Sequence, residues 1–315
     1  MAYQVRPHRM TSRPRRFLVI AARFTAALIV LVIAASWEGA DLALHPPAMS
    51  SDGELAHFPA LARITQNVSF PSRAVRGHAT VRLGGRFFPG HSHATIILTH
   101  GLGPDQNQML PWANFLHQAG YSVLTYDTRA RGKSGGTAVT LGALEQDDAL
   151  GAVDYTASRH DVDHTRIGAL GLSLGAAVTI MAAARDQRVR AVVADSAFSD
   201  ANAAISSAVM FIAHVPARPF AALTVAIAET RAGVNVDTIR PIDSVARISP
   251  RPIMLIHGLA DTYISPANSV RLYAAARPPK ELWLIPGAAH TDGYGVARSA
   301  YVRRVVSFFR RSLGS

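Results

Sequence analysis

Residues 166–184 run Arg-Ile-Gly-Ala-Leu-Gly-Leu-Ser-Leu-Gly-Ala-Ala-Val-Thr-Ile-Met-Ala-Ala-Ala, with Gly171-Leu172-Ser173-Leu174-Gly175 at the centre. The apolar run before this centre is typical of a buried strand, and the small-residue run after it is typical of a helix. A strand that turns sharply into a helix leaves no room for side chains beside the serine, so glycines are needed there and Oγ is left exposed. The stretch predicts that Ser173 is a nucleophile on a strand–turn–helix unit of an α/β fold.

The same pattern occurs a second time, at Gly132-Lys133-Ser134-Gly135-Gly136. This copy follows a polar loop and continues into Thr137-Ala-Val-Thr rather than into a helix, so we expect Ser134 to be a loop residue. Its Gly-Lys-Ser end is similar to a phosphate-binding P-loop, but that motif requires a glycine where this chain has Asp127. The chain is therefore not expected to cradle a nucleotide phosphate here.

A serine is a weak nucleophile near neutral pH and needs a base that is itself oriented by an acid. Asp261 follows the apolar run Ile253–Ile256, and His290 follows Leu282–Ile285. Both positions are loops after expected strands, where residues distant in sequence converge at the carboxyl edge of a sheet. Asp195, which follows the run Ala191–Ala194, is an alternative acid.

Apolar and polar runs alternate from about residue 67 onwards, which predicts a doubly wound, mostly parallel sheet of eight strands with helices on both faces. The expected strands are Val68–Phe70, Thr80–Leu83, Thr95–Thr99, Ser122–Tyr126, Ile167–Leu172, Ala191–Ala194, Ile253–Ile256 and Leu282–Ile285. The expected helices are Met109–Gln118, Leu144–Ser158, Gly175–Ala184, Pro266–Ala276 and Ala297–Leu313. The alanine-rich stretch 197–250, with helices expected over Ala201–Val215 and Phe220–Ala232, interrupts the alternation and predicts a small helical cap.

Five motifs in this order resemble the α/β-hydrolase superfamily over about residues 67–313. They are His100-Gly101-Leu102-Gly103, Asp127-Thr-Arg-Ala-Arg-Gly-Lys-Ser134, the stretch 171–175, His257-Gly-Leu-Ala-Asp261 and Gly287-Ala-Ala-His290. The resemblance implies that Ser173 is the nucleophile, His290 the general base and then acid, and Asp261 the orienting carboxylate.

The resemblance also implies an oxyanion hole formed by the backbone N–H groups of Leu102 and Leu174. Leu102 stands where lipase-type esterases with a His-Gly-Gly-Gly motif have glycine, so the resemblance is to the branch with a short His-Gly-x motif. The tether with Leu44-His45-Pro46-Pro47 before the domain is also similar to membrane-anchored relatives in that branch.

The amino-terminal end predicts a membrane segment. Residues 1–16 are basic, and residues 17–37 hold a 19-residue apolar run that only Arg23 interrupts. Arginines before the run and Glu38 and Asp41 after it predict a cytoplasmic amino terminus and an extracytoplasmic body. The alternative is a signal peptide cleaved around Ala34 and Ser36, with a secreted body. Residues 38–66 are expected to form a tether, and residues 67–315 the hydrolase domain with its cap at about 197–250.

The net charge of +11 is confined to the two ends of the chain. Six arginines precede residue 24 and five follow residue 297, and these eleven equal the whole excess, so the body between them is neutral by count. A nucleic-acid partner is therefore not expected. The absence of cysteine excludes disulfides, a thiol nucleophile and cysteine-ligated metals. The arginines of the last helix are expected on a solvated face, with contact to a membrane surface as the alternative.

We expect a membrane-anchored serine hydrolase that cleaves small-molecule or lipid-like carboxylic esters. Few charges occur near Met210, Phe211 and Phe220, which makes these cap residues candidates for binding an apolar substrate, although they could equally pack on the body. Alternatives with the same triad are a thioesterase, a peptidase or an acyltransferase, and a non-catalytic binding module is a further one. No cofactor or metal is expected, since His91-Ser-His93 offers only two ligands. The oligomeric state stays open.

Overall fold

The computed structural model describes residues 13–47, 54–103, 105–205 and 220–314. Within them eight strands form one sheet in the order β1-β2-β4-β3-β5-β6-β7-β8. The strand β2 pairs antiparallel with both neighbours, and every pair from β4 to β8 is parallel, so the sheet is mixed and mostly parallel. The strands are β1 Gln66–Pro71, β2 Arg82–Phe88, β3 Thr95–Thr99, β4 Ser122–Tyr126, β5 Ile167–Leu172, β6 Val189–Asp195, β7 Ile253–Gly258 and β8 Lys280–Ile285.

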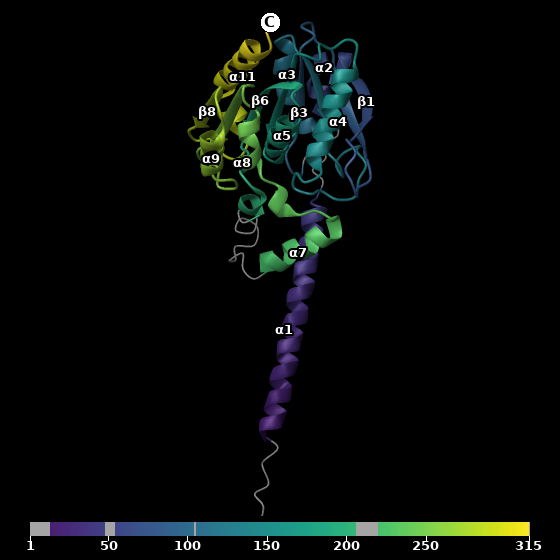
Figure 1. Ribbon diagram of the computed structural model, residues 1–315, viewed down its shortest axis with the longest axis vertical. Helices are drawn as coiled ribbons and strands as arrows, with labels where there is room; N and C mark the ends of the chain where they lie inside the picture. The colour runs from purple at the N-terminus through teal and green to yellow at the C-terminus, as the bar shows by residue number, and fades with distance from the viewer. Residues whose placement is uncertain (1–12, 48–53, 104, 206–219, 315) are drawn as a thin grey trace, which may run out of the picture.

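Helices cover both faces of the sheet (Figure 1). The helices are α1 Arg13–Leu44, α2 Pro59–Ile64, α3 Leu110–Gln118, α4 Glu145–Ser158, α5 Leu174–Arg185, α7 Phe220–Ala232, α8 Pro241–Ser244, α9 Ala267–Ala275, α10 Gly293–Val296 and α11 Arg298–Leu313. Short 3₁₀ turns are η1 Glu54–His57, η2 Gln106–Met109, η3 Val236–Thr238 and η4 Val245–Arg247.

Two hydrophobic cores lie on opposite faces of the sheet. One contains side chains of α4, α5 and α9, and the other contains side chains of α3 and α11. Strand β3 shows the division, because Ile97 packs in the first core and its neighbours Ile96 and Leu98 pack in the second. All five residues of β3 are buried, as the unbroken apolar run predicted for a strand covered on both faces.

Two parts of the chain differ from the sequence-based expectation. The second strand was expected to end at Leu83, before Gly84-Gly85, but β2 continues to Phe88. A side chain at Gly85 would lie 2.7 Å from the Thr125 carbonyl oxygen, so this glycine allows β2 to approach β4 rather than ending the strand.

The expected tether over residues 38–66 is largely helical where the structure describes it. Helix α1 runs without interruption to Leu44, and η1, α2 and the start of β1 occupy residues 54–66. Ala40 and Leu44 are buried, and the Leu44 carbonyl oxygen accepts the Val139 N–H of the body. The first proline after the apolar run is Pro46, so packing and composition both extend the helix.

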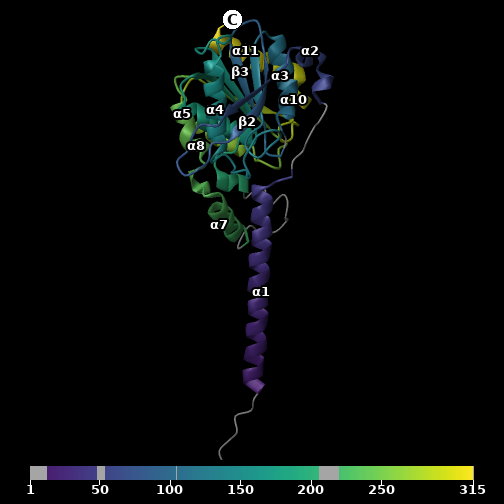
Figure 2. The same ribbon diagram turned by 90° about the vertical axis from the view of Figure 1, so that its right-hand side faces the viewer.

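Helix α1 leaves the body as a single long rod, and α7 crosses it close to the body (Figures 1 and 2). The stretch Phe17–Leu44 is long and apolar enough to cross a membrane. Most of its large side chains up to Trp37 are exposed, Phe17 at 77% and Trp37 at 51%. Such a helix is typical of a membrane anchor or of a signal sequence.

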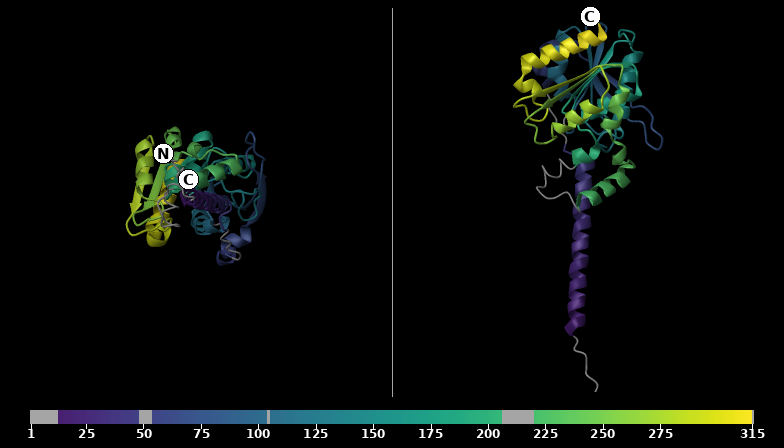
Figure 3. Two further views of the ribbon diagram at one scale, coloured as in Figure 1. Left: turned by 90° about the horizontal axis from the view of Figure 1, so that it is seen from below. Right: turned by 60° about the vertical axis from the view of Figure 1, so that its left-hand side comes forward.

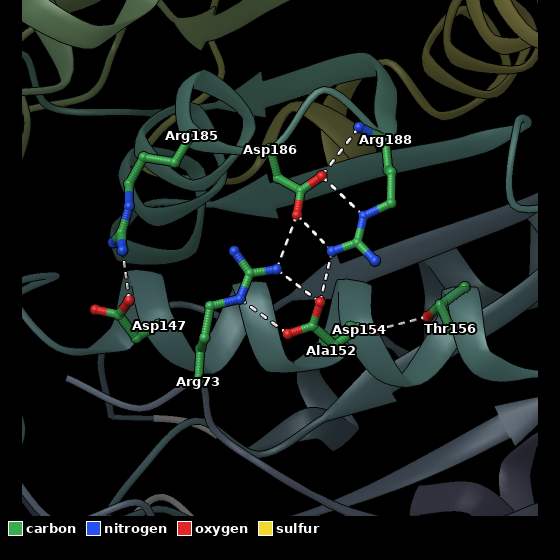
Figure 4. Close-up of polar contacts among 8 residues, drawn as sticks. All are labelled: Arg73, Asp147, Ala152, Asp154, Thr156, Arg185, Asp186 and Arg188. Carbon is green, nitrogen blue, oxygen red and sulfur yellow. Dashed lines mark hydrogen bonds and ion pairs between the residues drawn. The ribbon is translucent and has the colours of Figure 1, made fainter.

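Ion pairs join three separate segments on the helical surface beside α4 (Figure 4). Arg73 donates to Asp154 of α4 and to Asp186, at 2.6 and 2.9 Å, and Arg188 donates to the same two carboxylates at 2.5 and 2.6 Å. We call Arg73, Asp154, Asp186 and Arg188 the arginine–aspartate network. Burial alone would raise the pKa of Asp186, but hydrogen bonds from Arg188 and Arg73 outweigh it and hold the pKa well below the ordinary aspartate value. The network ties the chain after β1 to α4 and to the turn between α5 and β6.

Candidate active site

Ser173 lies at the sharp turn between β5 and α5, with φ of 53° and ψ of −117°. A left-handed φ is rare for a residue with a side chain and is characteristic of strained functional turns. A side chain at Gly171 would lie 2.2 Å from the Gly175 carbonyl oxygen, and one at Gly175 would lie 2.2 Å from that of Thr99. The two flanking glycines therefore allow the close approach that the turn requires.

The structure brings Ser173, His290 and Asp261 into one hydrogen-bonded chain. His290 Nε2 lies 2.8 Å from Ser173 Oγ, and His290 Nδ1 lies 2.6 Å from Asp261 Oδ2. Because the ionised carboxylate only accepts, Nδ1 carries the proton and Nε2 is free to accept one from the serine hydroxyl. This is the arrangement in which a serine is activated by a general base.

Four donors surround the Asp261 carboxylate. Oδ1 accepts the backbone N–H groups of Tyr263 and Ile264 at 2.9 and 2.8 Å, and Oδ2 accepts His290 Nδ1 and, at 3.1 Å, His257 Nε2. Burial alone would raise the pKa of Asp261, but the hydrogen bonds from His257 and His290 outweigh it and hold the pKa well below the ordinary value. The carboxylate is thus kept ionised and fixed in orientation.

His257 is a member of this site to which the sequence analysis assigned no role, although it begins the motif that contains Asp261. It is fully buried, and its Nε2 lies within hydrogen-bond distance of two acceptors, Asp261 Oδ2 and, at 2.8 Å, the Ile264 carbonyl oxygen. Nε2 must therefore carry the proton, and Nδ1 accepts the Ser269 hydroxyl at 2.7 Å. His257 thus donates to the Asp261 carboxylate through Nε2.

The loops that carry Asp261 and His290 are held together at the end of β7. A side chain at Gly258 would lie 2.2 Å from the Ala288 carbonyl oxygen, so this glycine lets the two loops touch. The Ala260 N–H donates to Ala288 at 2.9 Å. Parallel pairing of β7 with β8 then places both loops at the same edge as the end of β5.

The loop 100–103 passes directly beside Ser173. A side chain at Gly101 would lie 3.4 Å from Ser173 Cβ. His100 Nδ1 lies 2.8 Å from the Gly101 carbonyl oxygen, and the Gly101 N–H donates to Gln108 Oε1 at 2.8 Å. The carbonyl of a trans peptide points away from the N–H that follows it, so the Leu102 N–H is directed away from the His100 ring.

Leu174, whose N–H is the other expected oxyanion donor, is the first residue of α5. The first N–H groups of a helix have no partner within the helix and carry partial positive charge.

Two alternative assignments have other partners in the structure. The Ser134 hydroxyl donates to the Asp127 carbonyl oxygen at 2.6 Å and accepts the Gly84 N–H at 2.9 Å, as expected of a loop residue. The Asp195 carboxylate accepts Tyr301 Oη at 2.8 Å and Ser196 Oγ at 3.0 Å, and its complete burial raises its pKa. Asp195 is therefore hydrogen-bonded to Tyr301 of α11 rather than to His290.

The candidate substrate-binding residues are only partly within the described chain. Met210 and Phe211 lie outside the described residues, and Phe220 begins α7 with only its backbone described. Among the described residues, no group of three or more His, Cys, Asp or Glu side chains is arranged to hold a metal ion.

Solved structures resemble the chain in fold. The Pyrococcus furiosus esterase Pf2001 aligns with a TM-score of 0.70 at 25% identity, over 86% of this chain and 98% of that one. The α/β hydrolase GrgF from Penicillium sp. sh18 aligns with a TM-score of 0.62 at 21% identity, over 79% of this chain and all of that one. The protein is a serine hydrolase of the α/β-hydrolase type.

Sequence relatives define the family. The model of the prolyl oligopeptidase family matches residues 111–315. The uncharacterized protein YfhR of Escherichia coli (strain K12) is 31% identical over 241 residues, which is 74% of this chain and 78% of that protein. The uncharacterized protein Rv2307c of Mycobacterium tuberculosis (strain ATCC 25618 / H37Rv) is 31% identical over 67% of this chain and 69% of its own length. The chain belongs to the prolyl oligopeptidase family.

Proposed function

We propose that the protein hydrolyses carboxylic esters, with Ser173 as nucleophile, His290 as general base and then acid, and Asp261 as the orienting carboxylate. The observation that carries the proposal is the continuous hydrogen-bonded chain from Ser173 Oγ through His290 to Asp261 Oδ2. The likeness to the Pyrococcus furiosus esterase supports ester rather than amide hydrolysis.

In the proposed reaction, Ser173 Oγ attacks the ester carbonyl carbon while His290 Nε2 takes the hydroxyl proton. The Leu102 and Leu174 N–H groups stabilise the oxyanion that forms, and Asp261 stabilises the imidazolium. Collapse of the tetrahedral intermediate releases the alcohol, which receives the proton from His290. Water then attacks the acyl-enzyme with His290 again as base, and the carboxylic acid leaves.

The nucleophile can be tested with a matched pair of serine variants. A fluorophosphonate probe should label wild type and Ser134→Ala but not Ser173→Ala, and Ser173→Ala should lose hydrolysis of methylumbelliferyl butyrate by roughly 10⁴-fold or more. Thermal unfolding should show that Ser173→Ala remains folded. Equal labelling of wild type and folded Ser173→Ala would refute the assignment.

Peptide hydrolysis is the second candidate, favoured by the name of the family that the chain matches. An acyl-enzyme can form from an ester, a thioester or an amide, and the pocket decides which is used. Rates on ester, thioester and amide compounds that share one acyl group separate the candidates. We expect the ester to give the highest kcat/KM, and a faster amide would instead establish a peptidase.

We further propose that α1 anchors the protein in a membrane, with the amino terminus in the cytoplasm and the body outside. The support is the exposed apolar face of Phe17–Leu44 and the arginines that precede it in the sequence. The full chain should stay with membranes during alkaline carbonate extraction, and external protease should reach the body in intact spheroplasts. A protein released at its mature size without α1 would establish the secreted alternative.

A further inference from the structure

Helix α1 is longer than a bilayer requires. Its 32 residues extend about 48 Å at ~1.5 Å per residue, whereas the hydrocarbon core is about 30 Å thick. The apolar run begins at Phe17, and the first acidic residue after it is Glu38. The helix therefore leaves the hydrocarbon near Trp37, which is half exposed and of the residue type enriched at membrane interfaces.

Helix α7 packs against α1 just after this exit point. Arg231 of α7 donates to Asp41 at 2.5 Å, and its guanidinium lies 4.8 Å from the centre of the Trp37 ring. Gly39 allows close packing, because a side chain there would lie 3.3 Å from Thr224 Cγ2. The contacts hold α7 at the level where α1 passes from lipid to water.

The surface of α7 is largely uncharged, which suits a position at the membrane surface. The nine residues Phe220–Ala228 include no charged side chain, and Ala222 and Ala226 are exposed. Because it carries no charge that would have to leave water, this surface can lie at the boundary between headgroups and acyl chains.

The end of α1 also reaches the edge of the sheet that carries Ser173. The Val139 N–H donates to the Leu44 carbonyl oxygen at 2.8 Å, and Arg131 donates to that of Pro46 at 2.8 Å. Val139 and Arg131 belong to the loop that leaves the carboxyl end of β4. Strands β4, β3 and β5 are consecutive and parallel, so Ser173 leaves the sheet at this same edge.

We infer that the catalytic edge of the sheet faces the membrane, with α7 lying on the bilayer surface, and that the substrate is an ester lipid taken directly from that leaflet. The inference rests on the proposed esterase function and gives it a substrate class. Helix α11 lies at the end of the body opposite to α1, away from this membrane (Figure 3). A lipid ester in the leaflet then lies on the same side as Ser173.

The first test is a depth measurement in phosphatidylcholine vesicles. The chain has no cysteine, so Ala226→Cys on α7 and Ser307→Cys on α11 each provide a single site for a fluorescent label. Both positions are exposed. Nitroxide-labelled phosphatidylcholine should quench the label at Ala226→Cys strongly and leave that at Ser307→Cys unaffected. Equal quenching at the two positions, or none at Ala226→Cys, would overturn the orientation.

The second test compares two esters with the same fluorescent alcohol, methylumbelliferyl oleate held in the vesicles and methylumbelliferyl butyrate in solution. A charge at the lipid contact, Ala226→Asp, should slow hydrolysis of the oleate roughly tenfold and change that of the butyrate less than about twofold. The matched Ser307→Asp should change neither rate. Equal slowing of both esters by Ala226→Asp, or no slowing of the oleate, would overturn the inference.

The two esters also separate this inference from the proposed function. A protein that hydrolyses the butyrate but not the vesicle-held oleate is an esterase without the inferred substrate class. A folded, vesicle-bound protein that hydrolyses neither ester contradicts the proposed function itself.

Discussion

Asp261 and Asp186 are both buried carboxylates whose pKa is held below the ordinary value, but their partners differ. Asp186 is bound by two guanidinium groups, whose positive charge is permanent. Asp261 is bound by two histidines and two backbone N–H groups. In the proposed reaction a full positive charge forms beside it when His290 takes the serine proton.

Under the proposed mechanism, this difference separates a carboxylate that stabilises the fold, Asp186, from one that takes part in the reaction, Asp261. Neither Asp186 nor its arginine partners take part in the proposed reaction, so we expect Asp186 to contribute to stability alone. Dipoles hold Asp261 ionised and leave it able to stabilise an imidazolium that exists only transiently. Substitutions at the two positions should therefore affect different measurements.

Of the substitutions that compare these two carboxylates, Asp261→Asn is expected to have the largest effect on activity. An amide in place of the carboxylate cannot stabilise the imidazolium and favours the wrong tautomer of His290, so kcat/KM should fall by roughly 10⁴-fold. The measurement is hydrolysis of methylumbelliferyl butyrate, with circular dichroism to confirm folding. A loss smaller than about tenfold would assign Asp261 to the structural class of Asp186.

Asp186→Asn should lower the stability of the protein and leave its activity almost unchanged. It removes the more deeply buried of the two carboxylates that Arg73 and Arg188 share and leaves them only Asp154. Because both arginines are about one-third exposed, we expect a loss of about 2 kcal/mol in the free energy of unfolding. The urea midpoint of the purified full chain measures this loss. The kcat/KM of the folded variant should stay within about twofold of wild type, and a large drop would show that the arginine–aspartate network reaches the active site.

His257→Phe should have an intermediate effect on activity. It removes one of four donors from Asp261 and leaves the Ser269 hydroxyl without its acceptor, so kcat should fall roughly tenfold with KM little changed. His257→Gln, which keeps an N–H donor, is the matched control and should recover part of the rate. Equal rates for both variants would show that His257 only fills space.

The smallest effect concerns the dependence of stability on pH. The folded-state pKa of Asp186 lies below its unfolded value of about 3.8, so its stabilisation is complete above that pH and is lost as the pH falls through the folded value. Urea midpoints should be measured between pH 3 and 6 on wild type and on Asp186→Asn. As the pH falls, the midpoint of the variant should decrease less than that of wild type. Parallel curves would mean that Asp186 titrates normally.

Local patterns predicted the parts of the fold that local forces determine. The expected bounds of β3, β4 and β5 agree with the structure, because unbroken apolar runs between turn residues are buried on both faces. The end of β2 and the last turns of α1 were missed for one reason. Both depend on contacts with distant segments, Gly85 with β4 and Leu44 with the body, which no local periodicity encodes.

In the candidate site too, some contacts could be predicted from the sequence and others could not. Glycine spacing and chain order predicted that Ser173, Asp261 and His290 would meet, and the structure places them in contact. The contacts of His257 with Asp261 and of Gln108 with Gly101 were not predicted. They depend on how side chains turn inside the folded protein, and a buried histidine at the end of a strand has no distinguishing pattern.

Helix α1 has no break between Arg13 and its last buried residue, Leu44. In a bilayer, a helix of this kind adapts to hydrophobic thickness by changing its tilt. Under the proposed anchoring, the same helix carries the body, so a change of tilt would rotate the body with respect to the membrane plane. Lipid composition could then act on the enzyme mechanically, through bilayer thickness, without any molecule binding to regulate it.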